Sequence, residues 1–282
     1  MYLMSYFRTV SEALHLALSK DGLDWTPLNN NEPVLRGQVG SRTLRDPHIT
    51  SAEHGVYHLF STDGWGSRSI IHASSNDLLH WSEQEVVPVM ATIEGTRNCW
   101  APECYYDAEE RVYRLIWSST VRTGGPDGAW DHRIWSTATP DFKHYAPPTL
   151  FFDPGYSVID ATVAHHDGQY LMAFKDERGE NRLDTEYKAI RVCTSRSARG
   201  PFENVSDLIS PAPVEGPTLL RREDSWLMLY DHFLEERYGA CQSTNGITWE
   251  VLLEGAHFPP GARHACVLRV DESTVRGLQA LL

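Results

Sequence analysis

The chain alternates short apolar runs with polar turns, and one motif of this kind recurs along it. Each copy is an apolar run containing Ser or Thr, followed by a turn and then an aromatic residue. The five copies span 16–25, 71–81, 134–145, 192–202 and 240–249. Val, Tyr, Leu, Ile and Phe dominate the runs, and Gly, Asp, Asn and Pro separate them, which predicts β-strands. Only the last ten residues indicate a helix.

Two further sets of runs repeat in register with this motif. One set occupies 2–7, 56–63, 112–119, 169–176 and 226–233, and the other occupies 45–50, 101–107, 159–166, 215–222 and 263–270. Several short strands repeated five times, in units of about 50 residues, predict a five-bladed β-propeller. A β-sandwich also has many short strands, but it does not explain a repeated order within one chain.

The two ends of the chain complement each other in this repeat. The unit that begins at 2–7 has no innermost strand before it, and the run at the C-terminus has no blade after it. We therefore predict that 264–270 completes the N-terminal blade, which closes the ring and removes an exposed sheet edge. The predicted fold is all-β, with residues 1–282 forming a single domain.

Composition narrows the class of protein. The formal net charge of −13 argues against nucleic acid or an anionic membrane surface as partner and suits a neutral substrate. An apolar run long enough to span a membrane is absent, and the first residues lack the pattern of a secretory signal, so we expect a cytoplasmic protein. The five cysteines are scattered and predict neither disulfides nor a zinc site. The sequence leaves the oligomeric state open.

Ionisable residues lie near the start of all five predicted inner strands. They are Asp46, Glu103, Asp160, Glu215 and His264. A fivefold repeat places equivalent positions at one height, so we expect these side chains to converge at one end of the channel. Asp and Glu residues at such positions also commonly stabilise turns, and a ring of carboxylates could hold a structural cation. Because crowded like charges raise one another's proton affinity, we favour a functional site.

Glycoside hydrolysis needs this set of groups. One carboxyl group protonates the leaving oxygen, and another activates water or attacks the sugar. A third carboxylate can keep the proton donor protonated by repulsion between like charges. The nine Trp residues add ring faces of the kind that pack against sugars.

At these residues the chain resembles glycoside hydrolase family 43. The resemblance rests on SKDGLDW, LRDPHI, RNCWAPE, IDATV, VEGP and ARHACVL, which follow one another in the family's order. It implies an inverting enzyme that releases terminal arabinofuranosyl, xylosyl or related sugars, or cleaves arabinan internally. It also implies that Asp46 is the general base and Glu215 the general acid, and that Asp160 orients Glu215 and raises its pKa.

The same resemblance suggests secondary roles. Glu103 and Trp100 of the WAPE motif would contact substrate, although Trp100 could instead pack between blades. His264 would lie near a channel water or metal ion, and Ala265 after it departs from the glycine often found there. No cofactor is required, and a structural Ca²⁺ in the central channel is compatible with the pattern. Three residues near these motifs would line the pocket or donate to sugar hydroxyls: Arg263, Arg97 and Trp65.

Three other functions stay open at this point. Arg45-Asp46-Pro47 also resembles the retaining fructan-cleaving propellers of families 32 and 68, but their upstream Asn-Asp-Pro is absent. A non-catalytic carbohydrate-binding propeller fits the repeat, and a phosphorylase would need a basic phosphate site. We expect an inverting exo-glycosidase acting on a terminal furanosyl or xylosyl residue of a plant-type or similar glycan, like an α-L-arabinofuranosidase or β-xylosidase.

Overall fold

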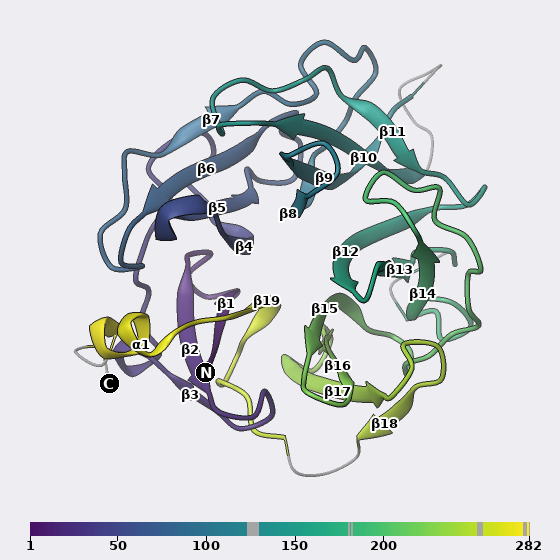
Figure 1. The fold of residues 1–282 in the computed structure, drawn as a ribbon. Coiled ribbons are helices and arrows are strands. Elements are labelled where there is room, and N and C mark those ends of the chain that lie inside the picture. Colours follow the sequence, from purple (N-terminus) through teal and green to yellow (C-terminus); the bar gives the residue numbers. More distant parts are fainter. Residues whose placement is uncertain (123–129, 180, 182, 253–255, 279–280, 282) are drawn as a thin grey trace.

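The computed structural model describes residues 1–282 apart from 123–129, 180, 182, 253–255, 279–280 and 282. The described residues form five antiparallel sheets arranged as blades around a central axis (Figure 1). This confirms the all-β, five-bladed β-propeller predicted from the repeats.

The blades follow chain order. Blade I contains β19 (Arg263–Arg269), β1 (Tyr2–Phe7), β2 (His15–Ser19) and β3 (Trp25–Pro27). Blade II contains β4 (Arg45–Ser51), β5 (Tyr57–Thr62), β6 (Ile70–Ser75) and β7 (Glu85–Val87). Blade III contains β8 (Trp100–Asp107), β9 (Val112–Thr120), β10 (His132–Thr139) and β11 (Thr149–Phe152). Blade IV contains β12 (Val158–His166), β13 (Gln169–Asp176) and β14 (Ile190–Ser195). Blade V contains β15 (Glu215–Arg221), β16 (Trp226–His232), β17 (Arg237–Ser243) and β18 (Glu250–Leu252).

Blade I closes the ring with strands from both ends of the chain. Strand β19 pairs antiparallel with β1, with Tyr2 opposite Arg269 (Figure 1). This confirms the predicted closure. The helix expected at the C-terminus is α1 (Glu272–Leu278), whose Val275 and Leu278 pack into the same hydrophobic cluster as Leu3.

The aromatic motif of the sequence is a turn with a fixed set of hydrogen bonds. In blade I, Ser19 Oγ accepts the amide of Gly22, and the indole nitrogen of Trp25 donates to the carbonyl of Gly22. In blade V, Ser243 accepts from Gly246, and Trp249 donates to the carbonyl of Gly246. The repeated Ser or Thr and the closing aromatic residue therefore satisfy the backbone of the turn between the third and fourth strands of a blade.

Each inner strand carries a β-bulge near its start, and this corrects the alignment expected from sequence. The pairing register shifts there, and one residue per strand adopts a left-handed backbone conformation. These residues are Asp46, Ala101, Asp160, Gly216 and His264. Glu215 therefore lies one residue before the bulge position and Glu103 two residues after it. The prediction that all five ionisable groups share one height is wrong, because a bulge aims neighbouring side chains in different directions.

A second pattern links neighbouring blades at the bulges. In blades II, III and V, a side chain near the end of the second strand accepts a hydrogen bond from the bulge amide of the next blade. Thr62 Oγ1 accepts from Ala101 N at 2.8 Å, and Ser118 Oγ accepts from Asp160 N at 3.0 Å. Asp231 Oδ2 accepts from His264 N at 3.2 Å.

Blade I has Phe7 at the equivalent position, opposite Arg263, and blade IV also breaks this pattern. Lys175 holds the equivalent position there, opposite Ile159, and its ammonium group has no acceptor to offer. The amide of Gly216 in the next blade instead donates to Asp160 Oδ2, at 3.1 Å.

Two other expectations concern the whole chain. All five cysteines are buried and form no disulfide. In the part of the chain that the structure describes, no helix has the length and apolar character needed to span a membrane.

Candidate active site

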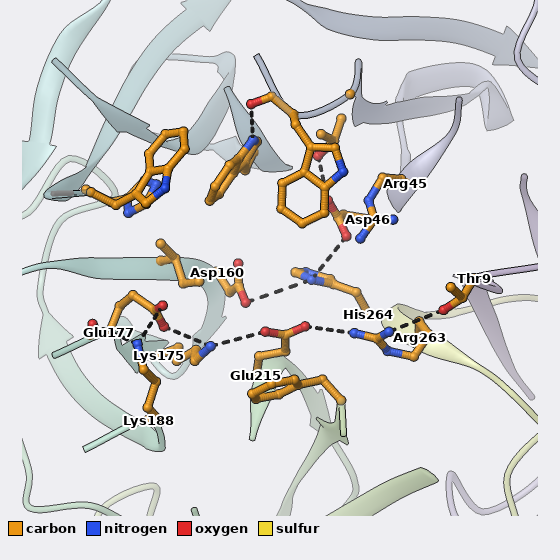
Figure 2. Close-up of a pocket in the computed structure, with 18 residues that line it drawn as sticks. Thr9, Arg45, Asp46, Asp160, Lys175, Glu177, Lys188, Glu215, Arg263 and His264 are labelled. Carbon is orange, nitrogen blue, oxygen red and sulfur yellow. Dashed lines mark hydrogen bonds and ion pairs between the residues drawn. The ribbon is translucent and has the colours of Figure 1, made fainter. Parts of the chain in front are cut away.

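A cavity of about 480 Å³ opens where the inner strands begin (Figure 2). Its volume falls in the range of small-molecule binding sites. Asp46, Asp160, Glu215 and His264 all line it, although they come from four different blades. The remaining lining residues are Thr9, Arg45, Thr62, Gly64, Trp65, Trp100, Trp130, His132, Ile159, Lys175, Glu177, Lys188, Phe233 and Arg263.

Asp46 is held by a hydroxyl group and an imidazole. Its Oδ2 accepts a hydrogen bond from Thr62 Oγ1 at 2.6 Å, and its Oδ1 lies 3.4 Å from Nδ1 of His264. Since Thr62 also accepts the amide of Ala101, the side chain that orients Asp46 is itself fixed by the neighbouring blade.

Asp160 lies on the other side of the same imidazole. Its Oδ2 accepts the amide of Gly216 and lies 3.9 Å from Nδ1 of His264. Burial raises the pKa of Asp160 to about 6, with a contribution from the charge of Glu215 and an opposing one from His264.

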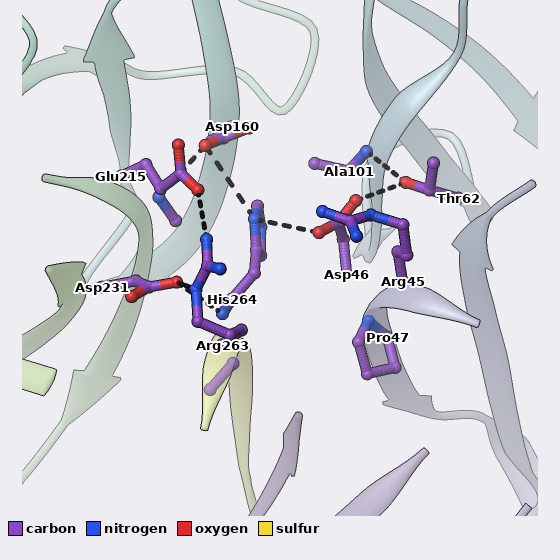
Figure 3. Close-up of polar contacts among 12 residues, drawn as sticks. Arg45, Asp46, Pro47, Thr62, Ala101, Asp160, Glu215, Asp231, Arg263 and His264 are labelled. Atoms are coloured by element: carbon purple, nitrogen blue, oxygen red, sulfur yellow. Dashed lines mark hydrogen bonds and ion pairs between the residues drawn. The ribbon is translucent and has the colours of Figure 1, made fainter. Parts of the chain in front are cut away.

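His264 lies between Asp46 on one side and Asp160 and Glu215 on the other (Figure 3). Burial disfavours its charged form, but the surrounding carboxylates, led by Asp160 and Asp46, outweigh burial and raise the pKa of His264. The carboxylates around His264 therefore favour the charged form of its imidazole.

Glu215 is bound by a cation at each oxygen. Its Oε1 accepts from Arg263 Nη2 at 2.9 Å, and its Oε2 accepts from Lys175 Nζ at 3.1 Å. Burial opposes ionisation, but Lys175 and Arg263 outweigh it and lower the pKa of Glu215. This corrects one expectation from sequence, in which Asp160 raises the pKa of Glu215: the raised pKa belongs to Asp160.

Both cations have second partners. Arg263 Nε donates to the buried carboxylate of Asp231, whose pKa burial raises to about 7. Lys175 Nζ lies 2.8 Å from Oε2 of Glu177, and Lys188 Nζ donates to Oε1 of Glu177 at 2.8 Å.

Sequence reasoning missed several residues of this network, namely Thr62, Lys175, Glu177, Lys188 and Asp231. A signal was available for three of them. Thr62, Lys175 and Asp231 each pair with the residue before a bulge, at the end of a second strand. The signal lies at the ends of the second strands, whereas the predicted carboxylates lie on the first strands.

One rim of the cavity is aromatic. The indole nitrogen of Trp100 donates to the carbonyl of Trp65 at 3.0 Å, and the rings of Trp100 and Trp130 lie 4.9 Å apart. Trp65 and Trp130 are 64% and 43% exposed. Arg97 lies outside the lining and stacks on Trp130, 3.8 Å from the ring centre. The predicted pocket residues Trp65, Trp100 and Arg263 therefore line the cavity directly.

Glu103 lies further along its strand and is not among the lining residues. It is buried, with Oε1 3.8 Å from Nδ1 of His48. Burial raises the pKa of Glu103 to about 8, although a hydrogen bond from Thr162 and the charge of His264 oppose this. Glu103 therefore lies outside the cavity lining, and burial favours the neutral form of its carboxyl group.

The carboxylates of the pocket face donors and cations of the protein. In the described ranges, no group of three or more His, Cys, Asp or Glu side chains is arranged to hold a metal ion. Oxygens of Asp46, Asp160 and Glu215 are engaged by Thr62, Gly216, Lys175 and Arg263. These residues do not form a ready oxygen cage for Ca²⁺. The channel ion and the metal role of His264 stay predictions.

Comparison with known families places the whole propeller in one group. The model of a family described as a probable glycosyl hydrolase domain, related to family 43, matches residues 1–275.

Individual relatives agree with this match. The α-L-arabinofuranosidase of Bifidobacterium longum subsp. longum is 26% identical over 79% of this chain, and the chain spans 26% of the length of that protein. A thermostable family-43 glycoside hydrolase superposes with a TM-score of 0.60 at 18% identity, over 78% of this chain and 74% of that chain. The xylan β-1,4-xylosidase of Bacillus halodurans has a TM-score of 0.60 at 18% identity, over 79% of this chain and 43% of that chain. At these identities the structural likenesses establish the fold.

Proposed function

Because the chain belongs to the family of probable glycosyl hydrolase domains related to family 43, we propose that it is an inverting, exo-acting glycosidase for a terminal furanosyl or xylosyl residue. The observation that carries this proposal is the approach of Asp46 and Glu215 to one cavity from two blades, with His264 between them (Figure 3). The α-L-arabinofuranosidase among the relatives supports the substrate class.

The proposed reaction is a single displacement. Asp46 accepts a proton from water as the water oxygen attacks the anomeric carbon of the sugar. The bond from that carbon to the glycosidic oxygen breaks, and its electron pair stays with the oxygen, which takes the proton of Glu215. Asp46 and Glu215 act from opposite sides of the sugar, which is the arrangement that inversion needs.

Neighbouring groups support these two steps. Thr62 and His264 fix the carboxylate of Asp46, so that its orientation toward water is set before substrate enters. Asp160 is fixed by the amide of Gly216 beside the acid. Trp100 and the exposed ring of Trp65 present apolar surfaces at the rim for the C–H face of a sugar.

A panel of aryl glycosides tests the proposal. It includes 4-nitrophenyl α-L-arabinofuranoside, β-D-xylopyranoside and β-D-galactofuranoside, each assayed with and without a chelator. We expect hydrolysis of at least one, and loss of that activity in Asp46→Asn by about two to four orders of magnitude. Inactivity on the whole panel together with retained sugar binding would favour the non-catalytic propeller. Loss of activity with chelator would support the channel ion.

A further inference from the structure

Lys175 is a buried cation that lies between two carboxylates of the pocket. We propose that Lys175 is a positioning residue, which holds Glu215 as a carboxylate before substrate binds and moves toward Glu177 when Glu215 takes up its proton. This inference rests on the proposed role of Glu215 as the proton donor.

The geometry gives Lys175 a choice of two partners. Its Nζ lies 3.1 Å from Oε2 of Glu215 and 2.8 Å from Oε2 of Glu177, on opposite sides of the ammonium group (Figure 2). The side chain of Lys175 is only 3% exposed, so water does not replace a partner that it leaves. A small displacement of Nζ therefore shifts one unit of positive charge from one carboxylate to the other.

The fold does not need a lysine at this position. In blades II, III and V, the equivalent residues Thr62, Ser118 and Asp231 bind the bulge amide of the next blade. Lys175 cannot accept that bond, and Asp160 accepts the amide of Gly216 in its place. The lysine thus replaces a structural link with a contact to Glu215.

The other charges of the network are anchored, which leaves Lys175 as the group free to move between partners. Arg263 is held on Glu215 by its second contact to Asp231. Lys188 donates to both the carboxylate and the backbone carbonyl of Glu177, so Glu177 stays in place as a partner for Lys175.

The movement of Lys175 accompanies the gain and loss of a proton by Glu215. In the free enzyme the two cations favour the carboxylate form of Glu215, which cannot protonate a leaving group. A bound sugar excludes water from the pocket, which favours the neutral acid, and Glu215 takes a proton from solvent as Lys175 moves to Glu177. When the glycosidic bond breaks and Glu215 loses that proton to the oxygen, Lys175 returns and stabilises the new carboxylate.

The pH profiles of kcat/KM and kcat test this exchange, because the first reports the free enzyme and the second the complex. In the wild type, we expect the alkaline limb of kcat to lie about one pH unit or more above that of kcat/KM. In Lys175→Met, the alkaline limb of kcat/KM should move to higher pH until it coincides with the alkaline limb of kcat. Lys175→Arg should restore the difference in pH between the two limbs. Arg114→Met is the matched control, since it removes a buried cation that pairs with Asp107 and Glu110 outside the pocket, and the two limbs should stay separate in this variant.

Removal of a buried cation could also unfold the protein, so a second variant keeps the charge balanced. Lys175→Met combined with Glu177→Gln removes one positive and one negative charge, and it should show the same rise in the kcat/KM limb.

Carbon-13 NMR titration of the Glu215 carboxyl group, assigned with Glu215→Gln, separates this inference from the proposed function. We expect the carboxyl to titrate about one pH unit or more higher in the charge-balanced variant than in the wild type. That rise without any glycosidase activity would reject the proposed function and retain the control of Glu215 by Lys175. Two results would overturn the inference. One is an active wild type whose kcat/KM and kcat profiles have alkaline limbs at the same pH. The other is a Glu215 carboxyl group that titrates at the same pH in the charge-balanced variant as in the wild type.

Discussion

Oδ1 of Asp46 lies 3.4 Å from Nδ1 of His264, and the other oxygen of that carboxylate accepts the Thr62 hydroxyl. A carboxylate fixed at both oxygens has one orientation, which suits a group that must align a water molecule. The left-handed conformation of Asp46 at the bulge produces this orientation, because it turns the side chain away from the strand and toward the axis.

Asp46→Asn should abolish hydrolysis of both natural and activated substrates. The amide preserves the shape but cannot accept a proton from water, so we expect kcat to fall by about two to four orders of magnitude on either class. An unchanged thermal unfolding curve would show that the fold is intact. A variant that keeps more than about a tenth of the wild-type rate would remove Asp46 from the role of base.

Glu215→Gln should affect the two substrate classes differently. A natural glycan needs its leaving oxygen protonated, whereas a dinitrophenolate leaves without help, so only the first rate should fall steeply. The measurement is the ratio of kcat/KM on a dinitrophenyl glycoside to that on an oligosaccharide. If Glu215→Gln and Asp46→Asn lost activity equally on the dinitrophenyl glycoside, the division of roles between them would be wrong.

Gly216→Ala should disturb His264. A Cβ at this position would lie 3.0 Å from Cγ and 3.1 Å from Nδ1 of the imidazole. We expect a loss of about 1–3 kcal/mol in the free energy of unfolding, measured in urea, together with lower kcat.

Ala101 provides the matched control for that variant. It occupies the equivalent bulge position with φ of 49°, so a side chain at this backbone conformation is itself tolerated. Ala101→Gly should change activity little. Wild-type stability and kcat in Gly216→Ala would show that the imidazole has more room than the structure gives it.

Glu103→Gln should flatten the dependence of stability on pH. The folded protein raises the pKa of Glu103 from 4.5 to about 8, so between these values the folded state binds one more proton than the unfolded state. The free energy of unfolding contributed by this group therefore falls as pH rises through that window. A glutamine side chain is neutral in both the folded and the unfolded state, so its contribution to the free energy of unfolding does not change with pH. Thermal melts at pH 5 and pH 8 should differ less in the variant, and an equal difference would show that Glu103 is ionised in the native protein.

The propeller could be predicted from sequence because its repeat is carried by local chemistry. The Ser or Thr, the turn and the closing aromatic residue, as in Ser19 and Trp25, form one hydrogen-bonded unit that recurs along the chain. Closure by 264–270 followed from counting strands, since one blade lacked a strand and one strand lacked a blade.

The site could be predicted only in part. Asp46, Asp160 and Glu215 could be predicted because the sequence itself shows acidic residues at the start of the inner strands. Their relative heights were not, since a bulge adds a residue without any fixed sequence signature, and Ala101 occupies one bulge as readily as Asp46 occupies another. The pairing of Glu215 with Lys175 was also hidden, because it joins two blades across 40 residues.

Proton NMR of the first sugar released tests the central claim most directly, namely that Asp46 directs water to one face of the sugar while Glu215 protonates the oxygen on the other. A reaction followed from its first minutes, before mutarotation, should show the anomer opposite to that of the substrate. Accumulation of the anomer with the substrate's own configuration would contradict this account, since it requires a covalent glycosyl-enzyme intermediate that a base acting on water does not form.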